Sequence, residues 1–99
     1  MKKTVKNLIR ARVFYSGRVQ GVGFRYTAER FALELGLRGW VKNLPDNRVE
    51  ILCEGPKEKI EELFLNIQRS SLGAGARQGD SRWEDATGEF KDFRIEYWV

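Results

Sequence analysis

The stretch "SGRVQGVGFRY", residues 16–26, decides the fold because it joins the first predicted strand to the first predicted helix. Basic and apolar residues alternate before it, from Leu8 to Tyr15, with the period of two that a half-buried strand shows. After it, apolar residues recur at helical spacing in "FRYTAERFALELG", residues 24–36. Gly36 stands where a left-handed cap would end that helix. The three glycines of the stretch therefore lie in a strand-to-helix loop.

The middle of the chain predicts a hairpin and a second helix. "LRGWVKN" and "RVEILCE", residues 37–43 and 48–54, have the character of strands. The turn residues of "LPDN" between them predict an antiparallel hairpin. Pro56 suits the first position of a helix, and an amphipathic stripe follows it. The stripe consists of Ile60, Leu63, Phe64 and Ile67.

Two weaker strands are expected near the end of the sequence, around Arg77–Glu84 and Phe90–Tyr97. The first has poor strand propensity, because "GAGARQGDSRW", residues 73–83, contains no Val, Ile or Thr and has Gly79 in its middle. We expect a short, frayed or bulged edge strand there. The order β-α-β-β-α-β with an extra terminal strand predicts an α+β, ferredoxin-like sandwich, in which an antiparallel sheet carries both helices on one face. We expect residues 1–99 to form one domain.

The composition excludes several kinds of chemistry. The sequence contains no histidine, which excludes Ser-His and Cys-His nucleophiles and the usual zinc sites. Its one cysteine, Cys53, makes no internal disulfide, which fits a reducing compartment. Arginines interrupt the apolar runs after the basic start, and no apolar run approaches the roughly 20 residues that cross a bilayer. We therefore expect a cytoplasmic protein without a targeting segment. The formal net charge of +4 suits an anionic ligand but does not require one.

The glycine-rich loop has the features of an anion site. Gly17, Gly21 and Gly23 permit positive φ angles and a close approach of a ligand to backbone N–H groups. The helix that follows adds unpaired N–H donors and the positive end of its dipole. The spacing matches neither of the common nucleotide-binding loops, and a glycine-rich turn without a ligand fits it equally well. Arg25 favours the anion, because a cation in the first helical turn is disfavoured unless an anion shares the site.

Residues 16–56 resemble an acylphosphatase. Residues 17–25 match the family's phosphate loop, G-x-V-Q-G-V-x-F-R, and residues 36–43 match its second motif, G-x-x-G-x-V-x-N. "TGEFKDFRI", residues 87–95, resembles a common C-terminal segment of the family. The resemblance covers most of the sequence. It implies hydrolysis of acyl phosphates to carboxylate and inorganic phosphate, without a metal or an organic cofactor.

The resemblance also implies roles for individual residues. Arg25 corresponds to the family's substrate-binding arginine, and Asn43 to the asparagine that orients the attacking water. Backbone N–H groups of the loop would hold the phosphate; the loop comprises Gly17, Arg18, Val19, Gln20, Gly21 and Val22. The expected partners are a small-molecule acyl phosphate and inorganic phosphate as the product, with no nucleic acid and no membrane. We expect the protein to be a monomer.

This chemistry suits a sequence without histidine. Phosphoryl transfer passes through a loose transition state, and a carboxylate leaves readily at neutral pH, so little acid catalysis is needed. Positioning of the water and stabilisation of the phosphoryl charge remain. The amide of Asn43 is no base near neutral pH, but its oxygen accepts a hydrogen bond from a water molecule. By itself Asn43 also suits the start of a turn, and the two interpretations are compatible. The group that accepts the water's proton stays open.

Two other functions are compatible with this order of elements. RNA-recognition domains share the same order of elements and stack bases on aromatic residues of the central strands. Here the third strand has no aromatic residue and two outward glutamates, and Phe14 or Tyr15 alone makes a poor platform. A non-catalytic, acylphosphatase-like accessory domain of a larger carbamoyl-phosphate-processing protein is the other alternative. Loss of Arg25 or Asn43 would support it, and both are present.

Overall fold

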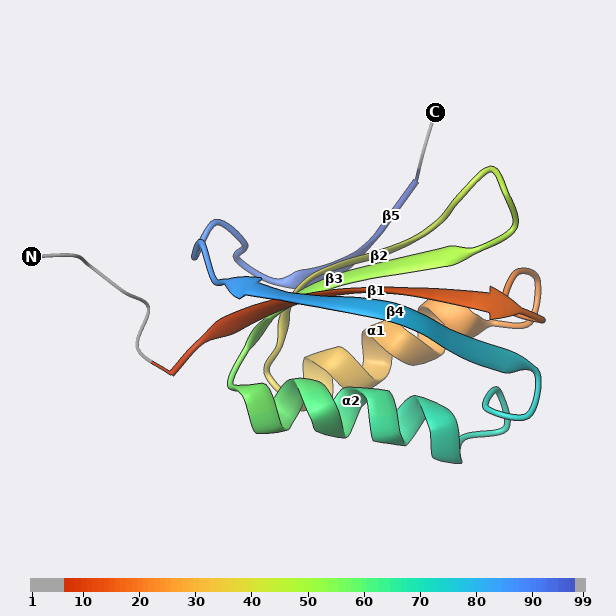
Figure 1. Ribbon diagram of the computed structural model, residues 1–99, viewed down its shortest axis with the longest axis horizontal. Coiled ribbons are helices and arrows are strands. Elements are labelled where there is room, and N and C mark those ends of the chain that lie inside the picture. The colour runs from red at the N-terminus through yellow and green to blue at the C-terminus, as the bar shows by residue number, and fades with distance from the viewer. Residues whose placement is uncertain (1–6, 98–99) are drawn as a thin grey trace, which may run out of the picture.

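In the computed structural model, which describes residues 7–97, a five-stranded sheet lies over two helices (Figure 1). The strands are β1 (Ile9–Gly17), β2 (Arg38–Asn43), β3 (Val49–Gly55), β4 (Ala76–Asp85) and β5 (Phe93–Glu96), and the helices are α1 (Phe24–Glu34) and α2 (Lys57–Arg69). The sheet order is β4-β1-β3-β2-β5, and both helices cover the same face. The predicted ferredoxin-like α+β fold is confirmed.

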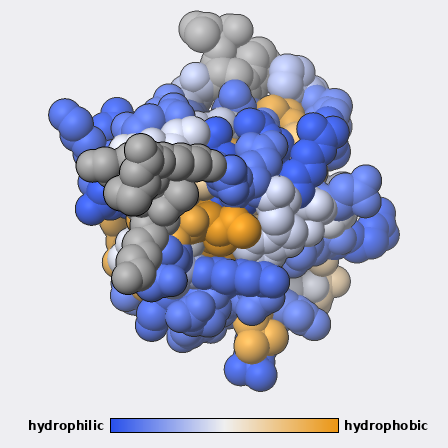
Figure 2. Space-filling view, turned by 60° about the vertical axis from the view of Figure 1, so that its left-hand side comes forward, coloured by the Kyte–Doolittle hydropathy of each residue, from blue (hydrophilic) through white to orange (hydrophobic). Residues whose placement is uncertain are grey.

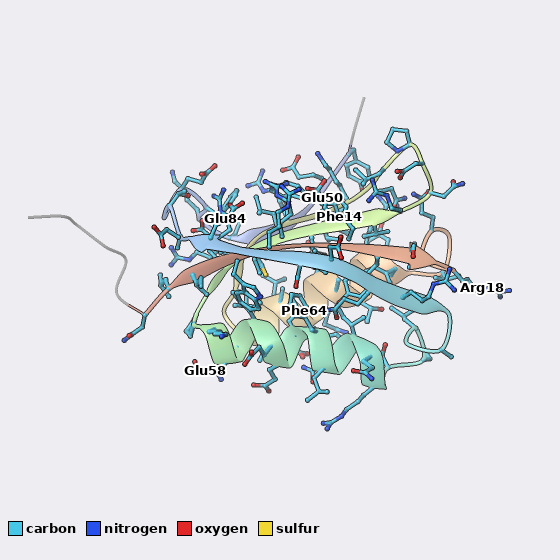
Figure 3. All side chains as sticks on the ribbon, in the orientation of Figure 1. Phe14, Arg18, Glu50, Glu58, Phe64 and Glu84 are labelled. Carbon is cyan, nitrogen blue, oxygen red and sulfur yellow. The ribbon has the colours of Figure 1, made fainter. Side chains whose placement is uncertain are left out.

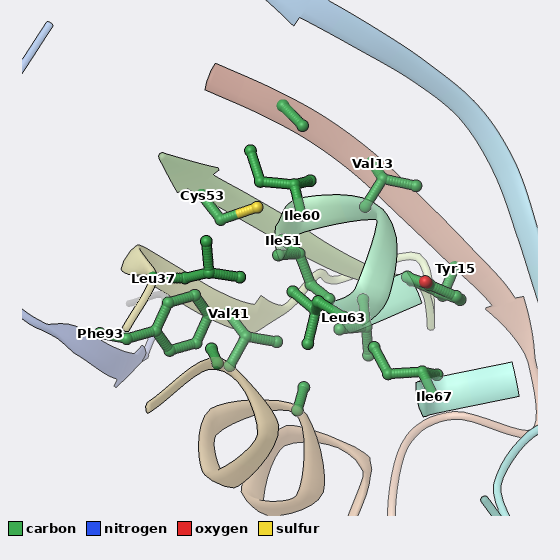
Figure 4. Close-up of a cluster of buried hydrophobic side chains, with 14 of the residues drawn as sticks. Val13, Tyr15, Leu37, Val41, Ile51, Cys53, Ile60, Leu63, Ile67 and Phe93 are labelled. Atoms are coloured by element: carbon green, nitrogen blue, oxygen red, sulfur yellow. The ribbon is translucent and has the colours of Figure 1, made fainter. Parts of the chain in front are cut away.

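The core lies between the sheet and the helices (Figure 4). Alternate residues of the strands point into it, and the predicted stripe of α2 fills the other side, with Ile60, Leu63 and Ile67 almost fully buried. Burying one such aliphatic side chain stabilises the fold by about 2 kcal/mol. Cys53 is a buried core residue, as the sequence predicts. The charged residues of α2 (Lys57, Glu58, Lys59, Glu61, Glu62 and Arg69) are exposed.

The open face of the sheet carries paired charges instead of apolar residues. Glu50 forms an ion pair with Arg12, and Glu54 accepts a hydrogen bond from Arg10 Nε at 2.8 Å. Both carboxylates are thereby buried, although they face away from the helices. Burial alone would raise the pKa of Glu54, but hydrogen bonds from the backbone N–H groups of residues 87–88 and from the side chains of residues 10 and 87 outweigh it, so this pKa lies below its usual value. Glu54 thus fixes the segment before β5 on the sheet.

The last two strands differ from the expectation in length and direction. β4 is ten residues long, so of the expected alternatives (short, frayed or bulged) the short strand is wrong and the bulged strand is found. It does lie at the edge of the sheet, and its register with β1 shifts between Val13 and Tyr15, opposite residues 78–81. This bulge contains Gly79, and backbone pairing with β1, rather than burial of side chains, forms the strand. β5 is shorter than predicted and parallel to β2, which makes the sheet mixed.

Three connections meet at one end of the sheet, the right-hand end in Figure 1. They are the β1–α1 loop, the β2–β3 turn and the α2–β4 loop. The opposite end, which comes forward in Figure 2, is largely hydrophilic around a small hydrophobic patch. None of the helices within residues 7–97 has the length and apolar character needed to span a membrane.

Candidate functional site

The β1–α1 loop adopts the left-handed glycine conformations that its sequence predicts. The φ angles of Gly17, Gly21 and Gly23 are +91°, +78° and +80°. Gly17 also packs closely on the α2–β4 loop, since a Cβ atom there would lie 2.5 Å from the carbonyl oxygen of Gly75. Only glycine combines this angle with this approach at low energetic cost. All three glycines thus use the positive φ angles that their residue type permits.

The backbone N–H groups of the loop divide into an occupied set and an open set. Arg18 N–H donates to the Gly75 carbonyl at 2.6 Å, and Val19 N–H donates to the Gly17 carbonyl at 3.0 Å. Within residues 7–97, the N–H groups of residues 20–26 form no hydrogen bond of normal length and angle with a protein acceptor, and the first bond of α1 runs from Thr27 N–H to Gly23. No acidic side chain lies in the first turn of α1. The open donors at the helix N-terminus therefore favour an anion.

Arg25 lies in this first turn of α1 and is half-buried. Its guanidinium carbon lies 5.3 Å from the ring centre of Tyr97, which follows β5. Among the described residues, no carboxylate lies within ion-pair distance of it. Its positive charge adds to that of the helix dipole rather than compensating it. Sequence reasoning missed Tyr97, because its contact with Arg25 depends on the arrangement of distant elements.

Arg18 differs from Arg25 in its surroundings. It is exposed and lies at the loop end of the sheet (Figure 3). Its backbone N–H is bonded to the Gly75 carbonyl, so it can offer a ligand only the solvated charge of its side chain. Val19 is almost fully buried and anchors the loop in the core. These two residues hold the loop in place, whereas the open donors begin at Gln20.

Asn43 ends β2 and faces the helix-covered side of the sheet. It pairs directly with Val49, which is buried on that side. Its Oδ1 is buried and accepts no hydrogen bond within the described part of the protein. An unpaired buried carbonyl oxygen costs about 1–3 kcal/mol, so such atoms are rare in folded proteins. Asn43 therefore presents an acceptor that suits the O–H group of a water molecule.

The side chain of Gln20 joins the loop to the β2–β3 turn. Its Nε2 donates to the carbonyl oxygens of Leu44 and Arg48, each at 2.9 Å. Leu44 directly follows Asn43, so this link brings the open N–H groups and the buried acceptor to one place. The sequence assigned Gln20 only a backbone role. The side-chain link was not predictable, because its acceptors are backbone carbonyls that leave no trace in the sequence.

Other reactive groups are unsuited to a site. Burial, followed by the charge of Glu54, raises the pKa of the Cys53 thiol to about 12, so it stays protonated at neutral pH. No group of three or more potential metal ligands is found in residues 7–97.

A cavity of about 280 Å³ lies between α2 and β4, and neither Arg25 nor Asn43 lines it. Its lining residues are Tyr15, Phe64, Ile67, Gln68, Gly73, Ala76 and Gln78.

Comparisons with known proteins point to one family. The family model described as acylphosphatase matches residues 11–95. An acylphosphatase of Roseiflexus sp. (strain RS-1) is 43% identical over 89 residues, which is 90% of this chain and 96% of that protein. The crystal structure of an acylphosphatase from Bacillus subtilis is 35% identical, with a TM-score of 0.75, and the match covers 90% of this chain and 99% of that one.

A third similarity involves a larger protein. The crystal structure of HypF from T. kodakarensis is 33% identical, with a TM-score of 0.75. The match covers 87% of this chain but only 11% of that one. The same fold therefore also occurs as a small part of a long chain.

Proposed function

This chain belongs to the acylphosphatase family, and we propose that it hydrolyses acyl phosphates to a carboxylate and inorganic phosphate. Arg25 and the open N–H groups of the β1–α1 loop hold the phosphoryl group, and Asn43 orients the attacking water. The proposal covers residues 1–99 as one acylphosphatase-like domain that acts in the cytoplasm on a small-molecule substrate.

The observation that carries the proposal is the buried Oδ1 of Asn43. It lies beside the turn that Gln20 links to the loop, and it has no donor among the described residues. A water molecule bound there donates one hydrogen to Oδ1, which turns a lone pair of the water toward the phosphoryl group. Water is the only nucleophile this requires, which agrees with the protonated state of the Cys53 thiol.

The reaction breaks the bond between phosphorus and the bridging oxygen. The water oxygen bonds to phosphorus as the carboxylate leaves in line with it, and both hydrogens of the water end on the phosphate product. Charge spreads over the three remaining phosphoryl oxygens in the transition state. A planar guanidinium with two parallel N–H groups and a set of fixed backbone N–H groups stabilises that charge without reorganisation. No step needs a metal ion or an organic cofactor.

We propose a different set of donors from the Gly17-to-Val22 loop that the sequence leads us to expect. The N–H groups of Arg18 and Val19 are bonded within the protein, so those of residues 20–26 are the available donors. Gly17 and Val19 instead fix the position of the loop, because Gly17 packs closely on Gly75 and Val19 is buried in the core. The phosphoryl group then lies over the N-terminus of α1, next to Arg25.

The nucleic-acid alternative is disfavoured by the open face of the sheet. The rings of Phe14 and Trp40 on this face are already covered, Phe14 by the guanidinium of Arg48 at 4.6 Å and Trp40 by the ammonium of Lys42 at 4.6 Å. Glu50 and Glu54 on the same face are buried and engage the guanidinium groups of Arg12 and Arg10. Bases would have to displace the cations from both rings before they could stack.

Hydrolysis of acetyl phosphate in excess chelator tests the proposed function. We expect the wild-type protein to release phosphate at the same rate with and without chelator, and the Arg25→Ala and Asn43→Ala variants to lose most of the activity. Activity that requires added metal, or that survives both substitutions, would refute the mechanism. An inactive but folded wild-type protein would support the accessory-domain alternative.

A further inference from the structure

We propose that Gln20 is a positioning residue, whose side chain fixes the distance between the phosphoryl cradle and Asn43. This inference rests on the proposed function, because it concerns the alignment of two parts of the same site. Gln20 itself need not touch the substrate with its side chain. It acts through the β2–β3 turn, whose first residue, Leu44, follows Asn43 in the chain.

The geometry of the link is specific. Both hydrogens of Gln20 Nε2 are used, one on the Leu44 carbonyl and one on the Arg48 carbonyl, each with a distance of 2.9 Å. These carbonyls also accept bonds within the turn, from Asn47 N–H to Leu44 at 3.2 Å and from Leu44 N–H to Arg48 at 2.8 Å. The side chain therefore holds both sides of the turn that joins β2 to β3. Two acceptors define its position better than one would.

The same two bonds fix the orientation of the side-chain amide. A reversed amide would place its oxygen against two carbonyl oxygens, so only one orientation is favourable. Gln20 is also the first residue of the loop whose own N–H is open. One residue thus belongs to the cradle through its backbone and holds the Asn43 strand end through its side chain.

The link is needed because the two halves of the site belong to different elements. The cradle follows β1 and leads into α1, whereas Asn43 ends β2, and β3 separates β1 from β2 in the sheet. No other side-chain hydrogen bond within residues 7–97 joins the loop to this turn. A shift of about 1 Å between reacting groups costs up to about a hundredfold in rate.

Gln20→Met tests this role, because methionine has a similar length but no donor. We expect kcat for acetyl phosphate to fall between about tenfold and a hundredfold. We expect the inhibition constant of inorganic phosphate to change less than about twofold, since phosphate uses the N–H groups and Arg25 but needs no oriented water. Gln68→Met, at an exposed position of α2, is the matched control and should leave both values unchanged.

A double-mutant cycle with Asn43→Ala distinguishes positioning from general damage. If Gln20 acts through Asn43, Gln20→Met lowers kcat by less than about twofold in the Asn43→Ala background. Equal effects in both backgrounds, weakened phosphate binding, or loss of folding in a thermal melt of Gln20→Met would each overturn the positioning role. An unchanged kcat in Gln20→Met with an active wild type would overturn it and leave the proposed function intact. An inactive wild type would overturn both.

Discussion

The β1–α1 loop and β4 both adjoin β1, but they differ in how their polar groups are satisfied. The loop continues β1 and leaves the N–H groups of residues 20–26 without protein acceptors. β4 pairs with β1 along its length and exposes nearly all its side chains, including the charged ones, to solvent. Charge in water is easily solvated, whereas an oriented but unpaired group costs stability. This contrast supports our proposal that unpaired oriented groups, rather than a high density of charges, mark the site.

The largest expected effect is that of Arg25→Ala, which removes the cation of the cradle. We expect kcat/KM for acetyl phosphate to fall by about 10³-fold or more, because the guanidinium compensates phosphoryl charge in the transition state. Phosphate binding should weaken as well. Arg30→Ala, on the exposed side of the same helix, is the control and should stay near wild type. Equal losses in the two variants would mean that helix damage, not charge, is measured.

Asn43→Ala is expected to separate catalysis from stability. We expect kcat to fall by about 10²-fold to 10³-fold while phosphate binding stays close to wild type, as for other single transition-state groups. The free energy of unfolding should not decrease, because the substitution removes a buried acceptor that has no donor. Chemical denaturation measures this, with Asn66→Ala on α2 as the control. A clear loss of stability in Asn43→Ala would mean that its oxygen is bonded within the protein.

The loop glycines should differ in their effect on stability. Gly17→Ala combines a strained positive φ with a contact against the Gly75 carbonyl, so we expect a loss of about 3 kcal/mol or more. Gly21→Ala has a similar φ but no atom within 4 Å of the added Cβ, so we expect a loss of about 1 kcal/mol. Thermal or urea unfolding measures both. Equal losses would show that backbone strain alone sets the cost.

The smallest effects are expected in β4. Arg82→Ala removes an exposed charge that forms no ion pair within the described residues, and we expect a change in unfolding free energy within about 0.5 kcal/mol and unchanged kcat. Initial rates and denaturation curves check this. A marked loss of activity in this variant would contradict the proposed contrast between the loop and β4, because it would mean that a charge on the edge strand is functional.

Local rules made most of the fold predictable. The alternation before the loop, the stripe of α2 and the glycines at residues 17–23 each act over a few residues, and the structure bears them out. The length of β4 was not predictable from its own residues, because backbone pairing with β1 stabilises the strand despite its poor propensity. The buried state of Glu50 was not predictable for a similar reason, since it depends on Arg12 of a neighbouring strand.

The residues of the candidate site also differ in whether local sequence predicts them. Arg25 was identified by a local conflict, a cation at the positive end of a helix. Asn43 came from its motif, and nothing local in the sequence indicates that its Oδ1 would be buried without a donor. The side-chain role of Gln20 and the contact of Tyr97 with Arg25 depend on backbone positions far along the chain, which no short pattern encodes.

The most direct test of the central claim is a titration of the ¹⁵N-labelled protein with inorganic phosphate, followed by backbone amide chemical shifts. The account predicts saturable shifts at residues 20–26, with much smaller shifts at Arg18 and Val19, whose N–H groups are already bonded. Arg25→Ala should abolish the shifts at the same phosphate concentrations. Saturable shifts centred on β4, or none in the loop of an active protein, would contradict the account.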